Sequence, residues 1–353
     1  MTRTLTVTHF SPWAEGLELT SSFLARLPKI NLSNKLSDPA DSNLLTMARL
    51  DCDWHGENTR CFSAMDAAHS IFKPARVTGI PGLLDLAKTP TPRDEEHWLI
   101  FDGQAPHKLA GALGKLMLLL SRQGHKIGWY SFDESSRTTT AFHEIAPFLD
   151  LLIHDEFPLD PKGKALLKKT CVTIHRSWVA NLIPFSVPFN EAPEEKILFL
   201  GSKLGLTDHR KRQIEFLSET FKDRFVAIHD HSVSVADRGS LNRYKVSLCP
   251  EGRKFTTPAM GMTHTDRPFW SGCLGMVPVS EDSTNGGRLE ELAEKQLILR
   301  YAHGDLDELK IACEQALALP DAERSRIYDH FNRHETVGAV LAEALQRTAT
   351  IAA

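Results

Sequence analysis

The sequence predicts an α/β fold in which two Rossmann-like domains face a cleft. Strand-like and helix-like segments alternate along the chain, a rhythm typical of a parallel sheet covered by helices. The rhythm is interrupted over 183–196, where three prolines and a charged run indicate a linker, and it then starts again. The length of 353 residues suits two domains of ordinary size.

In the N-terminal half, several short apolar runs are expected to be strands. They cover residues 5–10, 97–101, 126–132, 151–154 and 171–175. A helix is expected over about 106–123, because leucines such as Leu113, Leu116 and Leu120 follow helical spacing and Gly124 ends the pattern. This strand and helix alternation predicts an N-terminal α/β domain over residues 1–183.

In the C-terminal half the same pattern returns. Strands are expected at 196–200, 225–229, 244–250 and 275–279, and helices from Asp208, over 288–318 and over 321–345. We predict a Rossmann-like domain over 184–335. A C-terminal helix over 336–353 could pack back on the N-terminal domain.

The composition excludes several classes of protein. A hydrophobic fraction of 42% and a charged fraction of 24% are those of a globular protein. The net charge of −4 provides no general attraction to nucleic acid or to an anionic membrane. No run approaches the roughly 18–20 apolar residues of a transmembrane helix, and the alternating N-terminus lacks the apolar block of a signal peptide. The six cysteines are scattered, so we expect reduced thiols and a cytoplasmic protein without a nucleic-acid partner.

The most informative segment extends from Tyr244 to Glu281. A buried strand is followed by a loop rich in glycine, threonine and cations, then by a helix that begins near Asp266 and a glycine turn into another strand. A nucleoside diphosphate needs backbone N–H groups, hydroxyls and a fixed guanidinium close together. Those residue types are present as Gly252, Arg253, Lys254, Thr256, Thr257 and Arg267. Tyr244 and Pro250 would line the pocket for the nucleotide base. The alternative interpretation of the whole segment is a structural loop followed by a solvated helix start.

This segment resembles the donor-binding half of GT-B glycosyltransferases, particularly their exostosin-like branch. Cys249-Pro250-Glu251-Gly252 matches the strand and loop of that family, and Gly275-Met-Val-Pro-Val matches its closing turn. Arg267 matches the helix arginine, which the resemblance assigns to the donor diphosphate. The family's acidic helix residue falls here on Trp270 or Ser271. The ribose would then be held by another residue, with Glu281 or Asp282 in the next loop as candidates.

The start of the same domain supports the resemblance. Leu198-Phe-Leu-Gly201-Ser-Lys203 followed by the basic run His209–Arg212 is similar to the first strand and helix start of many GT-B enzymes. Gly201 permits close approach of the backbone to a ligand, and Lys203 could reach a phosphate. Arg210 belongs to the same predicted donor site, although a solvated helix face is the alternative for the basic run. The resemblance covers roughly residues 183–345.

The N-terminal half should hold the acceptor. An inverting transferase needs a carboxylate or an imidazole within hydrogen-bond reach of the acceptor hydroxyl. Candidates lie after predicted strands, namely His9, Glu15, Asp102, Asp133, Glu134, His154, Asp155 and Glu156. Asp102 and Glu15 lead, because a glycine neighbours each and leaves room for substrate. The alternative for each acid is a helix cap, and a retaining enzyme would need no such base.

No metal site and no cofactor are expected. Asp51, Asp53, His55 and Cys61 share one loop, and His229, Asp230 and His231 share another, but neither group has the paired spacing of a zinc site. The resemblance also implies an enzyme without bound metal.

The sequence therefore predicts a glycosyltransferase that moves a sugar from a nucleotide-sugar donor to a glycan or another hydroxyl acceptor. The family's habit suggests surface polysaccharide synthesis. Two alternatives stay open: a nucleotide-sugar epimerase or phosphorylase of the same fold, and a non-catalytic nucleotide- or glycan-binding protein, which the missing helix acid would favour.

Overall fold

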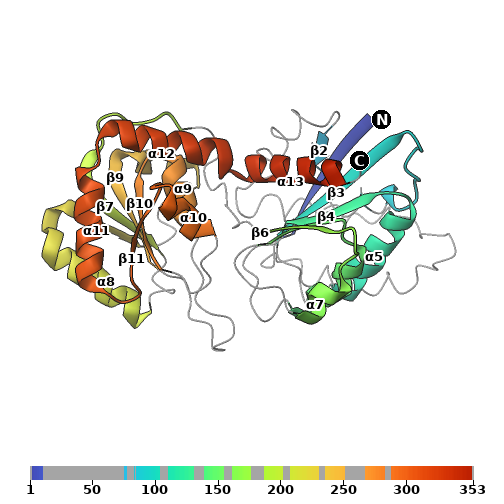
Figure 1. Cartoon of the computed structure of the whole chain (residues 1–353), viewed down its shortest axis with the longest axis horizontal. Helices are drawn as coiled ribbons and strands as arrows, with labels where there is room; N and C mark the ends of the chain where they lie inside the picture. The colour runs from blue at the N-terminus through green and yellow to red at the C-terminus, as the bar shows by residue number, and fades with distance from the viewer. Residues whose placement is uncertain are drawn as a thin grey trace. The chain divides into compact units, whose positions relative to one another are not determined.

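The computed structural model divides the chain into two compact units. One comprises Met1–Trp178 together with Gly338–Ala353, and the other comprises Val179–Val337. The structure describes residues 2–10, 75–77, 83, 85–103, 110–130, 139–154, 161–175, 187–201, 207–229, 235–250, 267–282 and 288–351. Figure 1 shows the whole chain with its helices and strands labelled.

The first unit is built on a parallel six-stranded sheet. In spatial order its strands are β2 (Ala75–Val77), β1 (Thr2–Phe10), β3 (Glu95–Gly103), β4 (Lys126–Tyr130), β5 (Leu151–His154) and β6 (Val172–His175). Its helices are α5 (Ala110–Arg122), α6 (Thr139–Ile145), the 3-10 turn η3 (Ala146–Phe148), α7 (Pro161–Leu166) and α13 (Val337–Ile351). The strand β2 was not expected from the sequence.

The core of the first unit forms between the sheet and α5. Leu113, Leu116 and Leu120 of α5 are buried at the predicted helical spacing, against Phe101 of β3 and Trp129 of β4. Gly124 ends the helix at a φ of 88°, a conformation that side chains rarely adopt. The helix and its end are therefore confirmed.

The second unit contains a parallel five-stranded sheet. In spatial order its strands are β11 (Leu299–Tyr301), β10 (Val277–Glu281), β9 (Tyr244–Cys249), β7 (Glu194–Gly201) and β8 (Phe225–His229). Its helices are α8 (Asp208–Phe221), the 3-10 segments η5 (Lys222–Arg224) and η6 (Val235–Arg243), α9 (Arg267–Cys273), α10 (Arg288–Glu294), α11 (Leu306–Ala318) and α12 (Asp321–His334).

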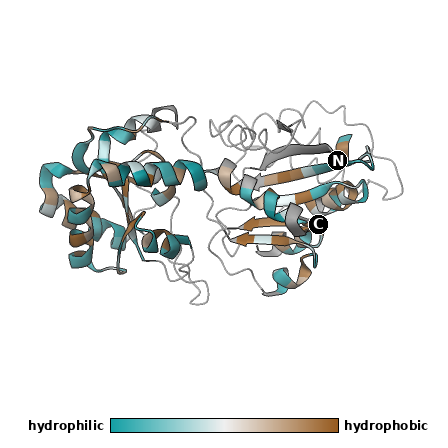
Figure 2. Cartoon of the chain, turned by 45° about the horizontal axis from the view of Figure 1, so that its top comes forward, coloured by the Kyte–Doolittle hydropathy of each residue, from teal (hydrophilic) through white to brown (hydrophobic). Residues whose placement is uncertain are grey.

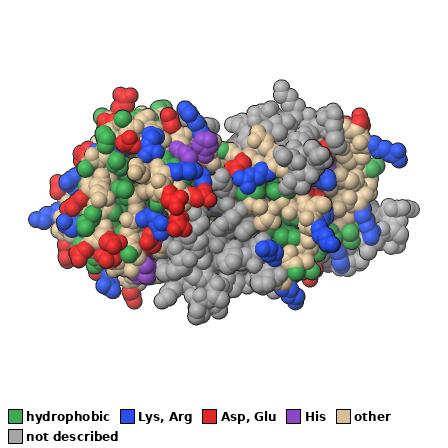
Figure 3. Space-filling model, viewed as in Figure 1, with side chains coloured by type: hydrophobic (Ala, Val, Ile, Leu, Met, Phe, Trp, Pro, Cys, Tyr) green, Lys and Arg blue, Asp and Glu red, His purple; other side chains and the backbone are tan. Residues whose placement is uncertain are grey.

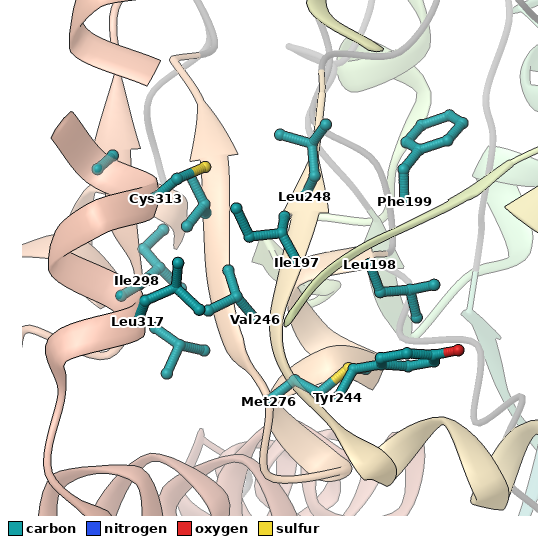
Figure 4. Packing of buried hydrophobic residues seen from close by; sticks show 14 of the residues in the cluster. Ile197, Leu198, Phe199, Tyr244, Val246, Leu248, Met276, Ile298, Cys313 and Leu317 are labelled. Carbon is teal, nitrogen blue, oxygen red and sulfur yellow. The ribbon is translucent and has the colours of Figure 1, made fainter. Parts of the chain in front are cut away.

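The central strands β9 and β10 are buried along their whole length, as parallel strands covered on both faces must be. Figure 2 shows hydrophobic residues concentrated on the strands of both sheets. Figure 4 shows Ile197 and Val246, from neighbouring strands, in one core with Cys313 and Leu317 of α11. Burial of the apolar face of α11 against these strands contributes to the stability of the unit.

Helices cover the two faces of the second sheet. Ser271 Oγ of α9 donates to Ser247 Oγ of β9 at 2.7 Å, so α9 covers the face of the sheet to which Ser247 points. Pro278 of β10 pairs with Ser247 and therefore points to the same face. Glu281, three residues further along β10, points to the opposite face, where Gln213 Nε2 of α8 donates to its carboxylate. The helices α9 and α12 contact each other, as do α8 and α11.

Two expectations for the C-terminal half were wrong in detail. The region 288–318 is not one helical stretch, because β11 separates α10 from α11. This edge strand has only three residues, too few to produce a strand pattern in the sequence. The region 321–345 is likewise interrupted, since α12 ends at His334 and α13 begins at Val337. Among the described residues, no helix combines the length and the apolar character needed to cross a membrane.

The two-domain α/β class is confirmed by the two parallel sheets. The expectation that the two domains face a common cleft remains a prediction.

Candidate functional site

Each sheet has one point where the order of its strands reverses. In the first sheet β2 and β3 lie on opposite sides of β1, and in the second β8 and β9 lie on opposite sides of β7. The loops leaving the carboxyl ends of the two strands at such a point diverge, which opens a crevice between them. Ligands of open α/β sheets bind there, so the carboxyl ends of β1 and β3, and of β7 and β9, are the candidate sites.

Arg267 occupies the reversal point of the second sheet. It is the first residue of α9, and its Nε donates to the carbonyl oxygen of Leu200 in β7 at 2.9 Å. Its guanidinium carbon lies 5.8 Å from the ring centre of Phe199, at the outer range of a cation–π contact. The side chain is partly exposed. The Nε–H group therefore fixes the orientation of the guanidinium at the end of β7. The two Nη groups of Arg267 take no part in this hydrogen bond to Leu200.

Gly201 makes this position of Arg267 possible. A Cβ added to Gly201 would lie 2.6 Å from Cζ of Phe199 and 3.3 Å from Nη2 of Arg267. Any side chain there would push against the aromatic ring and the guanidinium. The glycine thus leaves the last residue of β7 with bare backbone beside a fixed cation, a combination that suits a phosphate or a carboxylate.

Pro250 belongs to the same edge. Leu198 is level with Ser247, so continuing this register places Pro250 beside Gly201. Pro250 is buried. Its position agrees with a place in the floor of the predicted site, directly before the predicted phosphate-binding segment that starts at Glu251.

Most of the predicted phosphate-binding residues lie outside the described residues. They are Lys203, Gly252, Arg253, Lys254, Thr256 and Thr257. Their expected role stays a prediction. Among the predicted donor-site residues that the structure does describe, Arg267, Gly201 and Pro250 lie at the same edge of the second sheet.

Tyr244 is located elsewhere than predicted, and Arg210 is not on a solvated helix face. Tyr244 is the first residue of β9, at the amino edge of the sheet, where its hydroxyl accepts from Nη2 of Arg243 at 2.7 Å. A strand of six residues separates the two edges by roughly 17 Å, so Tyr244 does not line a pocket at the carboxyl edge. Arg210 is buried on the inner face of α8 rather than exposed on a solvated face, whereas Lys211 and Arg212 are exposed.

Glu281 does lie at the carboxyl edge, but its carboxylate is fully buried. Its Oε1 accepts from Gln213 Nε2 and from the backbone N–H of Gly304, both at 3.0 Å. Nε2 of His209 lies 2.6 Å and Nδ1 of His303 lies 2.9 Å from the same oxygen. This carboxylate is engaged inside the protein, so the expectation that it binds a ribose is not supported by its geometry. Asp282, the other candidate, accepts from Nε of Arg300.

Asp102 lies at the reversal point of the first sheet. In the strand register it is level with His9 of β1 and Tyr130 of β4. The backbone of the leading candidate base is therefore at the carboxyl edge where a ligand of this sheet would bind. His154 ends β5 at the same edge, whereas Glu15, Asp133, Glu134, Asp155 and Glu156 lie outside the described residues.

Sequence reasoning missed the cluster formed by His209, Gln213, Glu281 and His303. Its members come from α8, the end of β10 and the turn after β11. His209 and Glu281 are separated by 72 residues. No local spacing marks such a group. The parallel pairing of β10 with β11 and the contact of α8 with Glu281 bring it together.

Three of the described cysteines have thiols whose pKa is raised by burial. Burial raises the pKa of Cys313 to about 12 and raises the pKa of Cys273 well above its ordinary value. Burial, with the Asp150 charge, raises the pKa of Cys171 to about 12. Since the thiolate is the reactive form, we expect Cys273 and Cys313 of the native protein to resist iodoacetamide at pH 8 and to react fully in denaturant. Mass spectrometry of the labelled peptides measures this, and rapid native labelling of Cys313 would contradict the burial.

Solved structures of several glycosyltransferases are similar to this chain at low identity. The spinosyn rhamnosyltransferase SpnG complexed with spinosyn aglycone shares 13% identity, with 98% of this chain and 100% of that chain covered and a TM-score of 0.40. An α,α-trehalose-phosphate synthase (UDP-forming) from Burkholderia vietnamiensis shares 12% identity, with 99% and 100% covered and a TM-score of 0.43. An E. coli structure described as trehalose-6-phosphate bound with UDP-2-fluoro glucose shares 12% identity, with 98% of each chain covered and a TM-score of 0.41.

No family model and no curated protein matches the sequence. The α/β class of the chain rests on the strand order of its own two sheets.

Proposed function

We propose that this protein is a glycosyltransferase that moves a sugar from a nucleotide-sugar donor to a glycan or another hydroxyl acceptor. One observation carries the proposal: Arg267 is held beside the bare backbone of Gly201, at the point where the strand order of the second sheet reverses. A fixed, partly exposed guanidinium at this position suits the diphosphate of a nucleotide.

In the proposed reaction, the acceptor hydroxyl oxygen attacks the anomeric carbon of the sugar. The bond between that carbon and the diphosphate oxygen breaks, and the bonding electrons leave with the nucleoside diphosphate. The negative charge that develops on this leaving group would be neutralised by Arg267, together with Lys254 from the loop that precedes α9. Cations oriented before the reaction stabilise such a charge without rearrangement, and no metal ion or cofactor is part of this step.

The proton of the acceptor hydroxyl would go to a carboxylate of the first unit in an inverting reaction. We favour Asp102 over Glu15, because the strand register places Asp102 at the reversal point of the first sheet. An acceptor in surface polysaccharide synthesis and a cytoplasmic location are further parts of the proposal. Their support is the resemblance of the segment around Cys249 and Arg267 to exostosin-like donor-binding domains.

A thermal-shift measurement tests the donor site. The full-length protein is heated with UDP, GDP, ADP or CMP, and with the corresponding sugar nucleotides. A ligand at 100 times its Kd stabilises the folded state by about 2.7 kcal/mol, so one nucleoside diphosphate should raise the Tm by several degrees. We expect Arg267→Ala to abolish this rise and Arg267→Lys to keep part of it, because lysine retains the charge but not the planar geometry.

Arg212→Ala serves as the matched control, since Arg212 is an exposed arginine at the start of α8. Its response to nucleotides should equal that of the wild type. The donor-site proposal fails if no nucleotide raises the Tm of the wild type. Binding that resists Arg267→Ala would place the nucleotide elsewhere, and binding without release of nucleoside diphosphate in the presence of acceptors would favour the non-catalytic alternative.

A further inference from the structure

The cluster of His209, Glu281 and His303 contains the ligand types of a transition-metal site. One ligand atom from each residue lies within 4.8 Å of the other two. Two imidazole nitrogens and one carboxylate oxygen form a donor set that suits zinc and related divalent ions. The three residues come from different elements of the second unit, so the site exists only in the folded protein.

The crowding around one oxygen atom points to a shared cation. Oε1 of Glu281 has four nitrogen neighbours at 2.6–3.0 Å, from His209, His303, Gln213 and Gly304. A carboxylate oxygen offers about two lone pairs, fewer than the neighbours that converge on it. A metal ion bound by the two imidazoles and Oε1 removes this excess, because the imidazole nitrogens then direct their lone pairs at the ion.

The distances allow an ion to enter with small movements. Ligand atoms around a tetrahedral zinc ion at about 2.0–2.1 Å are separated by about 3.4 Å. The separations here are 2.6 Å from Oε1 to His209 and 2.9 Å from Oε1 to His303, so each must open by less than about 1 Å. The ligand nitrogens of His209 and His303 lie within 4.8 Å of each other and must come to the same separation. His209 and His303 are 28% and 43% exposed, which gives their rings room to turn and gives the ion access from solvent.

The groups around the three ligands form a second shell. Gln213 Nε2 and the Gly304 N–H donate to the carboxylate, and the hydroxyl of Tyr301 donates to Oε1 of Gln213 at 3.2 Å. Gly304 has a φ of 75°, and this turn carries His303 towards His209 until their ring centres are 4.3 Å apart. Such partners orient ligating side chains and are a usual part of metal sites.

We propose that His209, Glu281 and His303 bind a divalent transition-metal ion of the zinc class, with an open coordination position towards solvent. The ion would join α8, the end of β10 and the turn before α11. The proposed metal ligands do not include Arg267 or Gly201, and the ion plays no part in the transfer step proposed above, so either proposal can fail without the other.

Metal binding by the full-length protein tests the proposal. The chelator-treated protein is titrated with Zn²⁺ by calorimetry and with Co²⁺ by visible absorption. We expect one ion per chain and a Co²⁺ spectrum of nitrogen and oxygen ligands, without the charge-transfer bands of a thiolate. Zn²⁺ should also raise the Tm. His303→Ala should abolish these signals, and Gln213→Leu should weaken the Kd about 10- to 100-fold, as removal of outer-shell partners does.

His334→Ala is the matched control, because His334 is an exposed histidine of the same unit and its replacement should leave the Zn²⁺ affinity unchanged. His303→Ala replaces a side chain that is 43% exposed, and circular dichroism establishes whether the variant is folded. The absence of stoichiometric binding overturns the proposal. So does binding of equal affinity in folded His303→Ala and His209→Ala, or a Co²⁺ spectrum of thiolate ligands.

Discussion

Glu335→Ala should lower the free energy of unfolding of the second unit by about 3–5 kcal/mol, the usual effect of removing one member of a buried ion pair. Glu335 and Arg288 are 1% and 7% exposed. The carboxylate accepts from Nε of Arg288 at 3.2 Å and also from Nη2, so the pair is bidentate. Without Glu335, the guanidinium of Arg288 is left in a buried place without its main counter-charge. Urea-dependent amide exchange of peptides from β9 and β10 measures the effect in this unit alone.

The same arginine provides the control. Nη1 of Arg288 donates to Glu291, whose side chain is 57% exposed. Glu291→Ala removes a solvent-screened partner and should cost less than about 1 kcal/mol. The double change Arg288→Met with Glu335→Leu should recover most of the lost stability, because an apolar pair of similar volume needs no desolvated charges. Equal effects of Glu335→Ala and Glu291→Ala would contradict the buried-pair explanation.

Gly272→Ala should destabilise the second unit by a net of about 1–2 kcal/mol, although alanine is the better helix former. A Cβ on Gly272 would lie 2.3 Å, 2.4 Å and 2.7 Å from the Cδ2, Cγ and Cδ1 atoms of Phe331. Phe331 is fully buried in α12 and meets Phe269 edge to face, so its ring has no free space. The gain in helix propensity is about 1 kcal/mol, while overpacking a core costs about 1–3 kcal/mol or more. With three contacts below 3.0 Å, the clash should win.

This glycine lies in the helix that starts with Arg267. A displaced α9 would move the guanidinium away from Leu200 and Gly201, so Gly272→Ala should also reduce the Tm rise produced by the donor nucleotide. Phe331→Leu in the Gly272→Ala background should restore part of the stability, with a coupling energy of about 0.5–3 kcal/mol in the double-mutant cycle. Gly239→Ala is a control, because its Cβ would meet one atom at 3.2 Å. A Gly272→Ala protein as stable as the wild type would show that α9 and α12 separate without cost.

Sequence periodicity predicted the elements with strong local signals. The leucines of α5 follow a helical repeat and Gly124 ends it, and the apolar run before Pro250 has the length of a buried strand. The start of α9 at Arg267 was also predicted closely, since the sequence indicated a helix from about Asp266. The three-residue strand β11 was missed, since its stability comes from pairing with β10 and not from its own residues.

The sequence by itself determined the α/β class and the position of Arg267 at the start of a helix, because strand and helix periods and helix starts are local properties of the chain. Only the tertiary structure decided that Tyr244 lies at the amino edge, that Glu281 is buried, and that His209 and His303 meet its carboxylate. It also decided that Arg288 forms a buried ion pair with Glu335. These contacts join residues distant in sequence, and they depend on strand order and on the faces to which the crossover helices pack.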